Sequence, residues 1–132
     1  MAFFRCKPAL VGTTLWTNSS PTSSVSANTN ATLSKSIANF KYISVKYRVS
    51  TSNSTTYESG LVKTSDYSAS GGSSYPLSRP LWLGVKTNSS DNYSRAVNYN
   101  SNTSVTFSGC VKFGATTISN TYCIPIQIIG YN

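Results

Sequence analysis

The segment from Phe40 to Val49, FKYISVKYRV, alternates between apolar and polar side chains. One face carries Ile43, Val45, Tyr47 and Val49, and the other carries Tyr42, Ser44, Lys46 and Arg48. A period of two is that of a β-strand with one buried face. The segment therefore predicts a half-buried strand and restricts the chain to folds in which a sheet covers a core.

Shorter runs of the same kind recur along the chain, and clusters rich in Ser, Asn and Gly separate them, among them NSSPTSS, SASGGSS and TNSSDN. No helical periodicity of useful length is present. About eight short strands at such spacing predict an all-β fold, an antiparallel, jelly-roll-like β-sandwich without significant helix. The residues expected to face inward are Ile43, Val45, Tyr47, Val49, Leu81, Leu83, Val105, Phe107, Ile124, Ile126 and Ile128. Pro125 lacks a ladder donor, so we expect its strand to lie at an edge or to carry a bulge.

The length fits one domain. A chain of 132 residues can bury a single core, and we expect residues 15–132 to form it and residues 1–14 to form a separate anchoring segment. No apolar run approaches the roughly 18 residues of a membrane span, and the N-terminus lacks the features of a signal peptide. The sequence therefore predicts synthesis in a cytosol, no export and no membrane insertion.

Catalytic side chains are scarce. The chain contains no histidine and only three carboxylates, Glu58, Asp66 and Asp91. General acid–base chemistry, glycoside hydrolysis and most hard-metal sites need several such groups at one place. We therefore expect no enzyme activity, no metal and no cofactor, and we interpret Asp91 and Arg95 as an ion pair within a loop.

Positive charge exceeds negative charge, giving a net charge of +8. Such a balance favours anionic partners: nucleic acid, a phosphate-rich cell-wall polymer or an acidic protein lattice. The cations are scattered singly, which disfavours a nucleic-acid surface. A single-stranded nucleic-acid binder would use Tyr42, Lys46 and Arg48, where basic residues and tyrosine share a strand face.

The three cysteines, Cys6, Cys110 and Cys123, show neither zinc-site nor CxxC spacing. We interpret them as small buried hydrophobic residues. A bridge between Cys110 and Cys123 stays open as an alternative, because neighbouring strands can bring two such residues face to face.

Two passages bracket the domain: LWTNSSPTSSVSANT at 15–29 and CIPIQIIGY at 123–131. With FKYISVKYRV and RAVNYNSNTSVTFSG between them, their order resembles a small β-rich domain in structural proteins of tailed bacteriophages and prophages, often at the C-terminal end of tail-fibre or other tail-associated chains. The resemblance implies a virion location, synthesis in the bacterial host cytoplasm and a homo-oligomer, with a trimer favoured. Only fourteen residues precede LWTN here, so we expect Phe3, Phe4, Arg5 and Lys7 to anchor the domain to another virion protein.

The resulting hypothesis is a non-enzymatic virion structural protein, tail- or fibre-associated, that also binds a host-surface glycan. The alternatives are a capsid decoration or head-fibre protein, a free carbohydrate-binding module and, less favoured, a single-stranded nucleic-acid binder. Candidate glycan-contact residues are Tyr67, Tyr75, Trp82, Tyr93 and Arg95, although the apolar run PLWLGV favours a core position for Trp82. The loops at 68–74 and 87–94 are expected to face outward.

Overall fold

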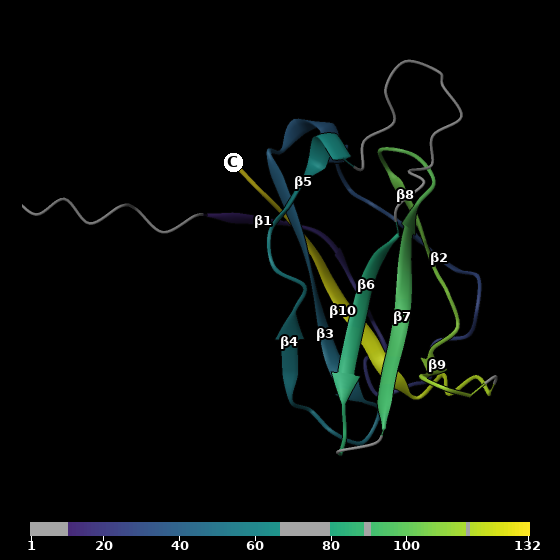
Figure 1. Cartoon of the computed structure of the whole chain (residues 1–132). Helices are drawn as coiled ribbons and strands as arrows, with labels where there is room; N and C mark the ends of the chain where they lie inside the picture. The colour runs from purple at the N-terminus through teal and green to yellow at the C-terminus, as the bar shows by residue number, and fades with distance from the viewer. Residues whose placement is uncertain (1–10, 67–79, 89–90, 116) are drawn as a thin grey trace, which may run out of the picture.

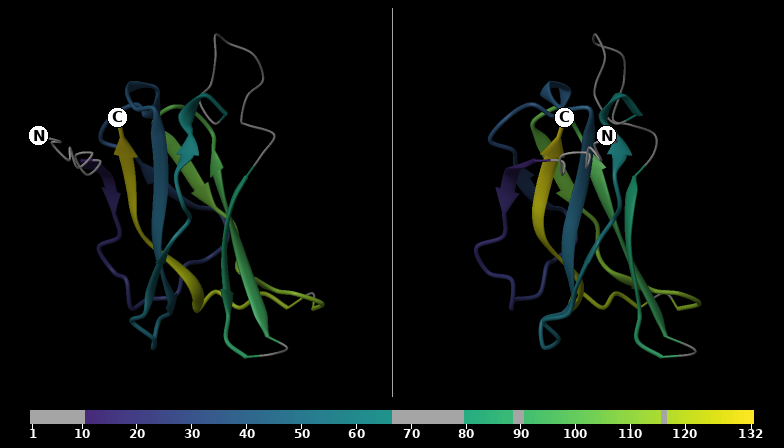
Figure 2. Two further views of the ribbon diagram at one scale, coloured as in Figure 1. Left: turned by 60° about the vertical axis from the view of Figure 1, so that its left-hand side comes forward. Right: turned by 90° about the vertical axis from the view of Figure 1, so that its left-hand side faces the viewer.

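The alternating segment becomes strand β3 (Tyr42–Ser50), which lies inside one of two antiparallel sheets. A computed structural model describes residues 11–66, 80–88, 91–115 and 117–132, and Figure 1 shows their strands in two layers. Sheet A has the order β1 (Gly12–Thr17), β10 (Tyr122–Tyr131), β3 and β4 (Thr56–Glu58), with β5 (Val62–Lys63) also pairing with β3. Figure 2 shows this layer from the side, packed against the second one.

Sheet B has the order β2 (Thr29–Thr32), β8 (Ser104–Phe107), β7 (Asn92–Tyr99) and β6 (Leu81–Lys86), and β9 (Val111–Lys112) also pairs with β7. Two 3-10 helices of three residues each, η1 (Ile37–Asn39) and η2 (Thr64–Asp66), complete the described elements. The predicted β-sandwich is confirmed, with ten strands, some of only two or three residues. β1, β2 and β3 alternate between the sheets, whereas β6, β7 and β8 are successive neighbours in sheet B.

The core lies between the inner faces of the two sheets. All the residues predicted to face inward are buried except Ile126. The pairing of β10 with β3 shifts register between Pro125 and Gln127, so Ile126 falls in a bulge and is only partly buried. Pro125 therefore sits at a bulge and not at an edge, because β10 lies between β1 and β3.

Strand β1 begins before the boundary expected after residue 14. Gly12, Thr13 and Thr14 belong to β1 and pair with the last residues of β10, from Tyr131 back to Ile129. The sandwich therefore begins at or before Gly12. Residues 1–10, including Phe3, Phe4, Arg5 and Lys7, lie outside the described residues.

Candidate functional site

The register of sheet B decides which side chains gather on its outer face, because residues directly opposite in an antiparallel pair point to the same side. Leu81, Leu83 and Val85 of β6 are buried, so Trp82, Gly84 and Lys86 point outward. Gly84 pairs with Ser94, Ser94 with Val111, and Val111 makes an isolated bridge to Ile118. Lys86 pairs with Asn92, and the Asn92 carbonyl accepts a hydrogen bond of 2.7 Å from the backbone N–H of Phe113.

Four large apolar side chains on or beside these rows are exposed to solvent. The exposed fractions are 59% for Trp82, 38% for Val111, 80% for Phe113 and 54% for Ile118. Only three other large hydrophobic residues in the described part of the chain are exposed, and they are spread over sheet A and its loops. Exposed apolar side chains gathered on one face are the kind of feature from which interaction surfaces are built.

An open hollow of about 380 Å³ lies within this face. Its lining consists of Gly84, Val85, Lys86, Asn92, Tyr93, Ser94 and Phe113. Gly84 has no side chain to fill this space. A Cβ added there would meet no heavy atom closer than the Tyr93 carbonyl oxygen at 3.8 Å. We call this space the outer hollow. It combines one exposed ring with hydroxyl, amide and ammonium groups, the mixture found in sites for small polar ligands.

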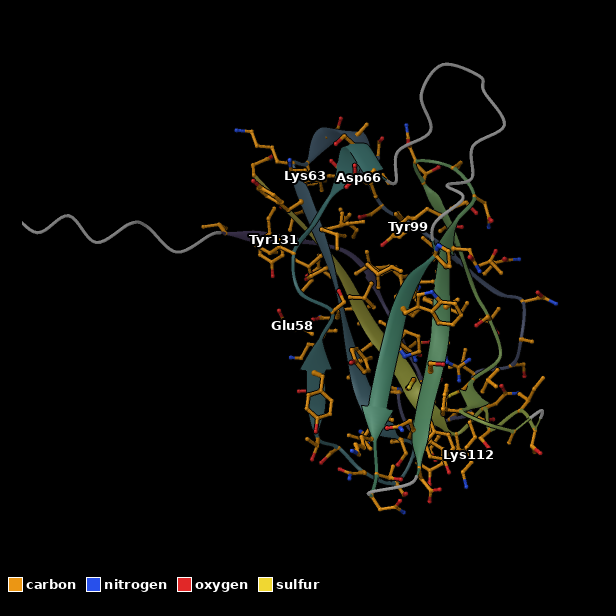
Figure 3. All side chains as sticks on the ribbon, in the orientation of Figure 1. Glu58, Lys63, Asp66, Tyr99, Lys112 and Tyr131 are labelled. Atoms are coloured by element: carbon orange, nitrogen blue, oxygen red, sulfur yellow. The ribbon has the colours of Figure 1, made fainter. Side chains whose placement is uncertain are left out.

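An ion pair closes the end of β7 near the outer hollow. Lys112 Nζ lies 2.7 Å from Asp91 Oδ1, and Asn88 donates a second hydrogen bond of 2.7 Å to Asp91 Oδ2. These two contacts, the first being the stronger cause, lower the pKa of Asp91 below its usual value, and the same pair raises the pKa of Lys112. Figure 3 shows Lys112 at the opposite end of the sandwich from Lys63 and Asp66.

Arg95 is not a surface residue, and its expected pairing with Asp91 is wrong. Its side chain is fully buried, and it donates five hydrogen bonds of 2.6–3.1 Å to backbone carbonyls. The acceptors are Val25, Ser108, Asn120, Tyr122 and Cys123. A guanidinium has five N–H donors, so every one of them is used. Burial lowers the pKa of Arg95. It is therefore a structural residue and not a glycan contact.

The other candidate contacts divide between the two faces of sheet B. Trp82 is exposed, so the core position favoured for it is wrong. The Tyr93 ring is buried and stacks on Tyr122, with ring centroids 3.9 Å apart and planes at 5°. Tyr67, Tyr75 and the 68–74 loop lie outside the described residues. Sequence reasoning missed Phe113, Val111 and Ile118, whose short, polar-flanked segments carry no clear periodicity.

The residues that would serve a nucleic-acid binder lie on the outer side of sheet A and are partly engaged. Lys46 stands opposite Glu58 in the pairing of β3 with β4. Arg48 donates to the carbonyls of Ser50 and Thr51 at 3.2 and 3.3 Å. Neither arrangement leaves a continuous basic stripe along β3.

The three carboxylates come from separate places. Figure 3 shows Glu58 at the side of the molecule and Asp66 at one end, while Asp91 pairs with Lys112. Within the described residues, no group of three or more His, Cys, Asp or Glu side chains is arranged to hold a metal ion. The same part of the chain contains no helix with the length and apolarity to cross a membrane.

Comparisons of the chain with protein-family models, with curated proteins and with solved structures give no match.

Proposed function

We propose that this protein is a non-enzymatic binding domain that holds a surface glycan on the outer face of sheet B. The observation that carries the proposal is the exposure of Trp82 and Phe113 on one sheet face, on either side of the Gly84–Ser94 pair. A sheet face with exposed rings offers apolar surfaces for sugar rings. The neighbouring Ser94, Asn92 and Lys86 offer hydrogen bonds to hydroxyl groups.

Polar side chains continue the same face beyond the rings. Asn98 stands opposite Thr106 in the pairing of β7 with β8, and Thr106 stands opposite Asn30 in the pairing of β8 with β2. The Thr106 hydroxyl donates to Asn30 Oδ1 at 2.6 Å and accepts a hydrogen bond from Asn100. These contacts fix the amides in position before any ligand arrives. A chain of sugar units longer than one ring would find hydrogen-bonding groups along the sheet.

We place this domain on the particle of a tailed bacteriophage, tail- or fibre-associated, where it contacts the host surface. The support is the resemblance carried by residues 15–29 and 123–131. In this setting residues 1–10 attach the domain to another virion protein and the chain is a homo-oligomer, with a trimer favoured. The net charge of +8 suits an anionic polymer of the host envelope. A capsid decoration or head-fibre protein, or a free carbohydrate-binding module, would use the same face and differ only in its location.

An array of bacterial surface polysaccharides tests the proposal. Trp82→Ala and Phe113→Ala should each weaken binding by about tenfold or more, equivalent to ~1.4 kcal/mol. Gly84→Val should block the outer hollow without disturbing the strand, because β-branched residues suit strands. Tyr57→Ala, which removes an exposed ring from β4 in sheet A, is the matched control and should bind like the unchanged protein.

The proposal fails if the unchanged protein retains no polysaccharide, or if the three sheet-B variants bind as well as it does. A single-stranded oligonucleotide serves as the competitor for the alternative function. If the oligonucleotide displaces the glycan at low micromolar concentration and Lys46→Ala abolishes this, the active surface is sheet A and the assignment is wrong.

A further inference from the structure

Two buried thiols face each other across the core and take no part in the proposed glycan surface. Cys110 immediately precedes β9 in sheet B, and Cys123 is the second residue of β10 in sheet A. Both are free and fully buried. The register that pairs Ser94 with Val111 brings Cys110 opposite Arg95 on the inner face of sheet B. The two cysteines therefore come from different sheets and meet beside the buried guanidinium.

The two cysteines lie beside the same stretch of β7, and the backbone that carries them is held from several sides. The Cys123 thiol donates a hydrogen bond of 3.5 Å to the Tyr93 carbonyl, and each thiol shifts the pKa of the other. The Cys123 carbonyl accepts from Arg95 Nε at 2.9 Å. The Cys110 carbonyl accepts from the N–H of Ser119 at 2.7 Å.

The surroundings make the two sulfurs chemically different. The interaction of the two thiols lowers the pKa of Cys110 and raises the pKa of Cys123, and the charge of Arg95 acts to lower both. The thiolate is the attacking species in thiol–disulfide exchange. The lower pKa favours Cys110 as the attacking sulfur and Cys123 as the resolving one.

We propose that Cys110 and Cys123 are dithiol in a reducing compartment and form a disulfide between the two sheets when the protein meets a small-molecule disulfide oxidant. The Cys110 thiolate attacks one sulfur of the oxidant and releases one thiol. Cys123 then attacks the Cys110 sulfur of the mixed disulfide and releases the second thiol. Two protons and two electrons pass from the cysteines to the oxidant, which leaves as two thiols. Because both cysteines are buried, the first attack takes place during folding or local opening.

The bond would lock the sandwich after the protein leaves a reducing cytosol. It joins sheet B to sheet A and closes the loop between residues 110 and 123, which restricts the unfolded chain. A loop of this size predicts a melting temperature about 5–10 °C higher in the oxidised protein than in the reduced one.

The test uses a Cys6→Ser protein, so that only the pair of interest remains. The folded protein is equilibrated in glutathione buffers of increasing oxidising strength, and peptide mapping by mass spectrometry measures the Cys110–Cys123 cross-link. We expect a reversible cross-link. The folded protein should form it in buffers that are still too reducing for the protein unfolded in urea to form it. We also expect a higher melting temperature after oxidation. A Cys6→Ser, Cys123→Ser protein is the control and should show no intramolecular bond.

The oxidised and reduced samples of the Cys6→Ser protein have the same amino-acid sequence, so the comparison needs no destabilising substitution in the core. The proposal is wrong if the folded protein gains no cross-link at any glutathione ratio. It is also wrong if the cross-link forms only in urea, or if it lowers the melting temperature, because the native sulfurs would then be badly placed for a bond.

Discussion

At the scale of single residues, Arg95 connects β7 both to its neighbour β8 and to segments with which β7 does not pair. Its five carbonyl acceptors come from the loop after β1, the end of β8, the segment before β10 and β10 itself. A charged group without a carboxylate partner normally costs too much to bury. Here the charge is spread over a planar group whose every donor meets a carbonyl dipole, and the same contact satisfies carbonyls that would otherwise be orphaned in the core.

Two replacements of Arg95 therefore test separately the positive charge of its side chain and the number of hydrogen bonds that it donates. Arg95→Met should lower the free energy of unfolding by at least about 3 kcal/mol, since several buried carbonyls lose their partners while the cost of burying the charge is also removed. Arg95→Lys keeps the charge but has three donors on a single nitrogen, so it should also be strongly destabilised. Urea denaturation measures both.

Arg48→Met is the matched control, because Arg48 is partly exposed and makes two long hydrogen bonds to nearby carbonyls. Its effect should stay below about 1 kcal/mol. If both variants lose the same free energy of unfolding, the hydrogen bonds from Arg95 to its five carbonyl acceptors do not stabilise the protein as proposed.

At the scale of elements, β10 is the strand on which sheet A depends. It pairs with β1 on one side and β3 on the other, and Pro125 lies at a bulge in its pairing with β3. Its last residues also pack closely on the core. A Cβ added at Gly130 would lie 2.5 Å from the Phe40 ring, and two further atoms of that ring would lie within 2.8 Å. Gly130 is therefore required by close packing between β10 and the residue that follows η1.

We expect Gly130→Ala to destabilise the protein by about 1–3 kcal/mol, because the Phe40 ring must move out of a packed position. Gly84→Ala offers the comparison, since its Cβ would point into the open outer hollow, and its effect should be below about 0.5 kcal/mol. Thermal melting of the two variants gives the answer. A Gly130→Ala protein as stable as the Gly84→Ala protein would show that Phe40 has room to yield.

At the scale of the whole molecule, the two layers leave their outer faces with different chemistry. Sheet A presents Lys46, Arg48 and Glu58 among polar side chains, whereas sheet B presents Trp82 and its apolar neighbours. A side chain of sheet A covers part of the β6 edge of sheet B, because the Tyr47 hydroxyl donates a hydrogen bond of 2.7 Å to the Gly84 carbonyl. The proposed glycan face thus lies beside an edge that is blunted against pairing with other chains.

The N-terminal segment provides a test of assembly at this scale. Deleting residues 2–10 leaves β1 intact, so the melting temperature should be unchanged, while incorporation into phage particles should be lost. Deleting residues 2–14 also removes Gly12–Thr14 from the pairing with β10 and should lower the melting temperature. Sedimentation of the full chain and the shorter deletion should show a trimer in both. Full incorporation of the 2–10 deletion, or a monomer in both samples, would contradict the proposed anchor or the proposed assembly.

The sequence by itself determined the local features. Alternation along Tyr42–Ser50 was sufficient to predict that strand and the burial of Ile43, Val45, Tyr47 and Val49, because a strand's period of two is a property of the backbone. The same local reasoning anticipated a bulge as one place for Pro125. It also interpreted Cys110 and Cys123 as small buried residues, which is confirmed, and the bridge that it left open between them is not formed in this structure.

Only the tertiary structure decided where the charged and aromatic residues lie. Arg95 occupies an inward position on β7, and it can stay there because Val25, Asn120 and Cys123, distant in sequence, bring carbonyls to it. The solvent exposure of Trp82 depends on whether another layer covers sheet B, which no local pattern states. The outer hollow likewise exists only because the register of β6, β7 and β9 brings Gly84, Ser94 and Phe113 together. The alternation of side chains along a strand is a local property of the backbone. Whether a side chain is buried, and which side chains come together in a site, depends on contacts between segments far apart in the chain.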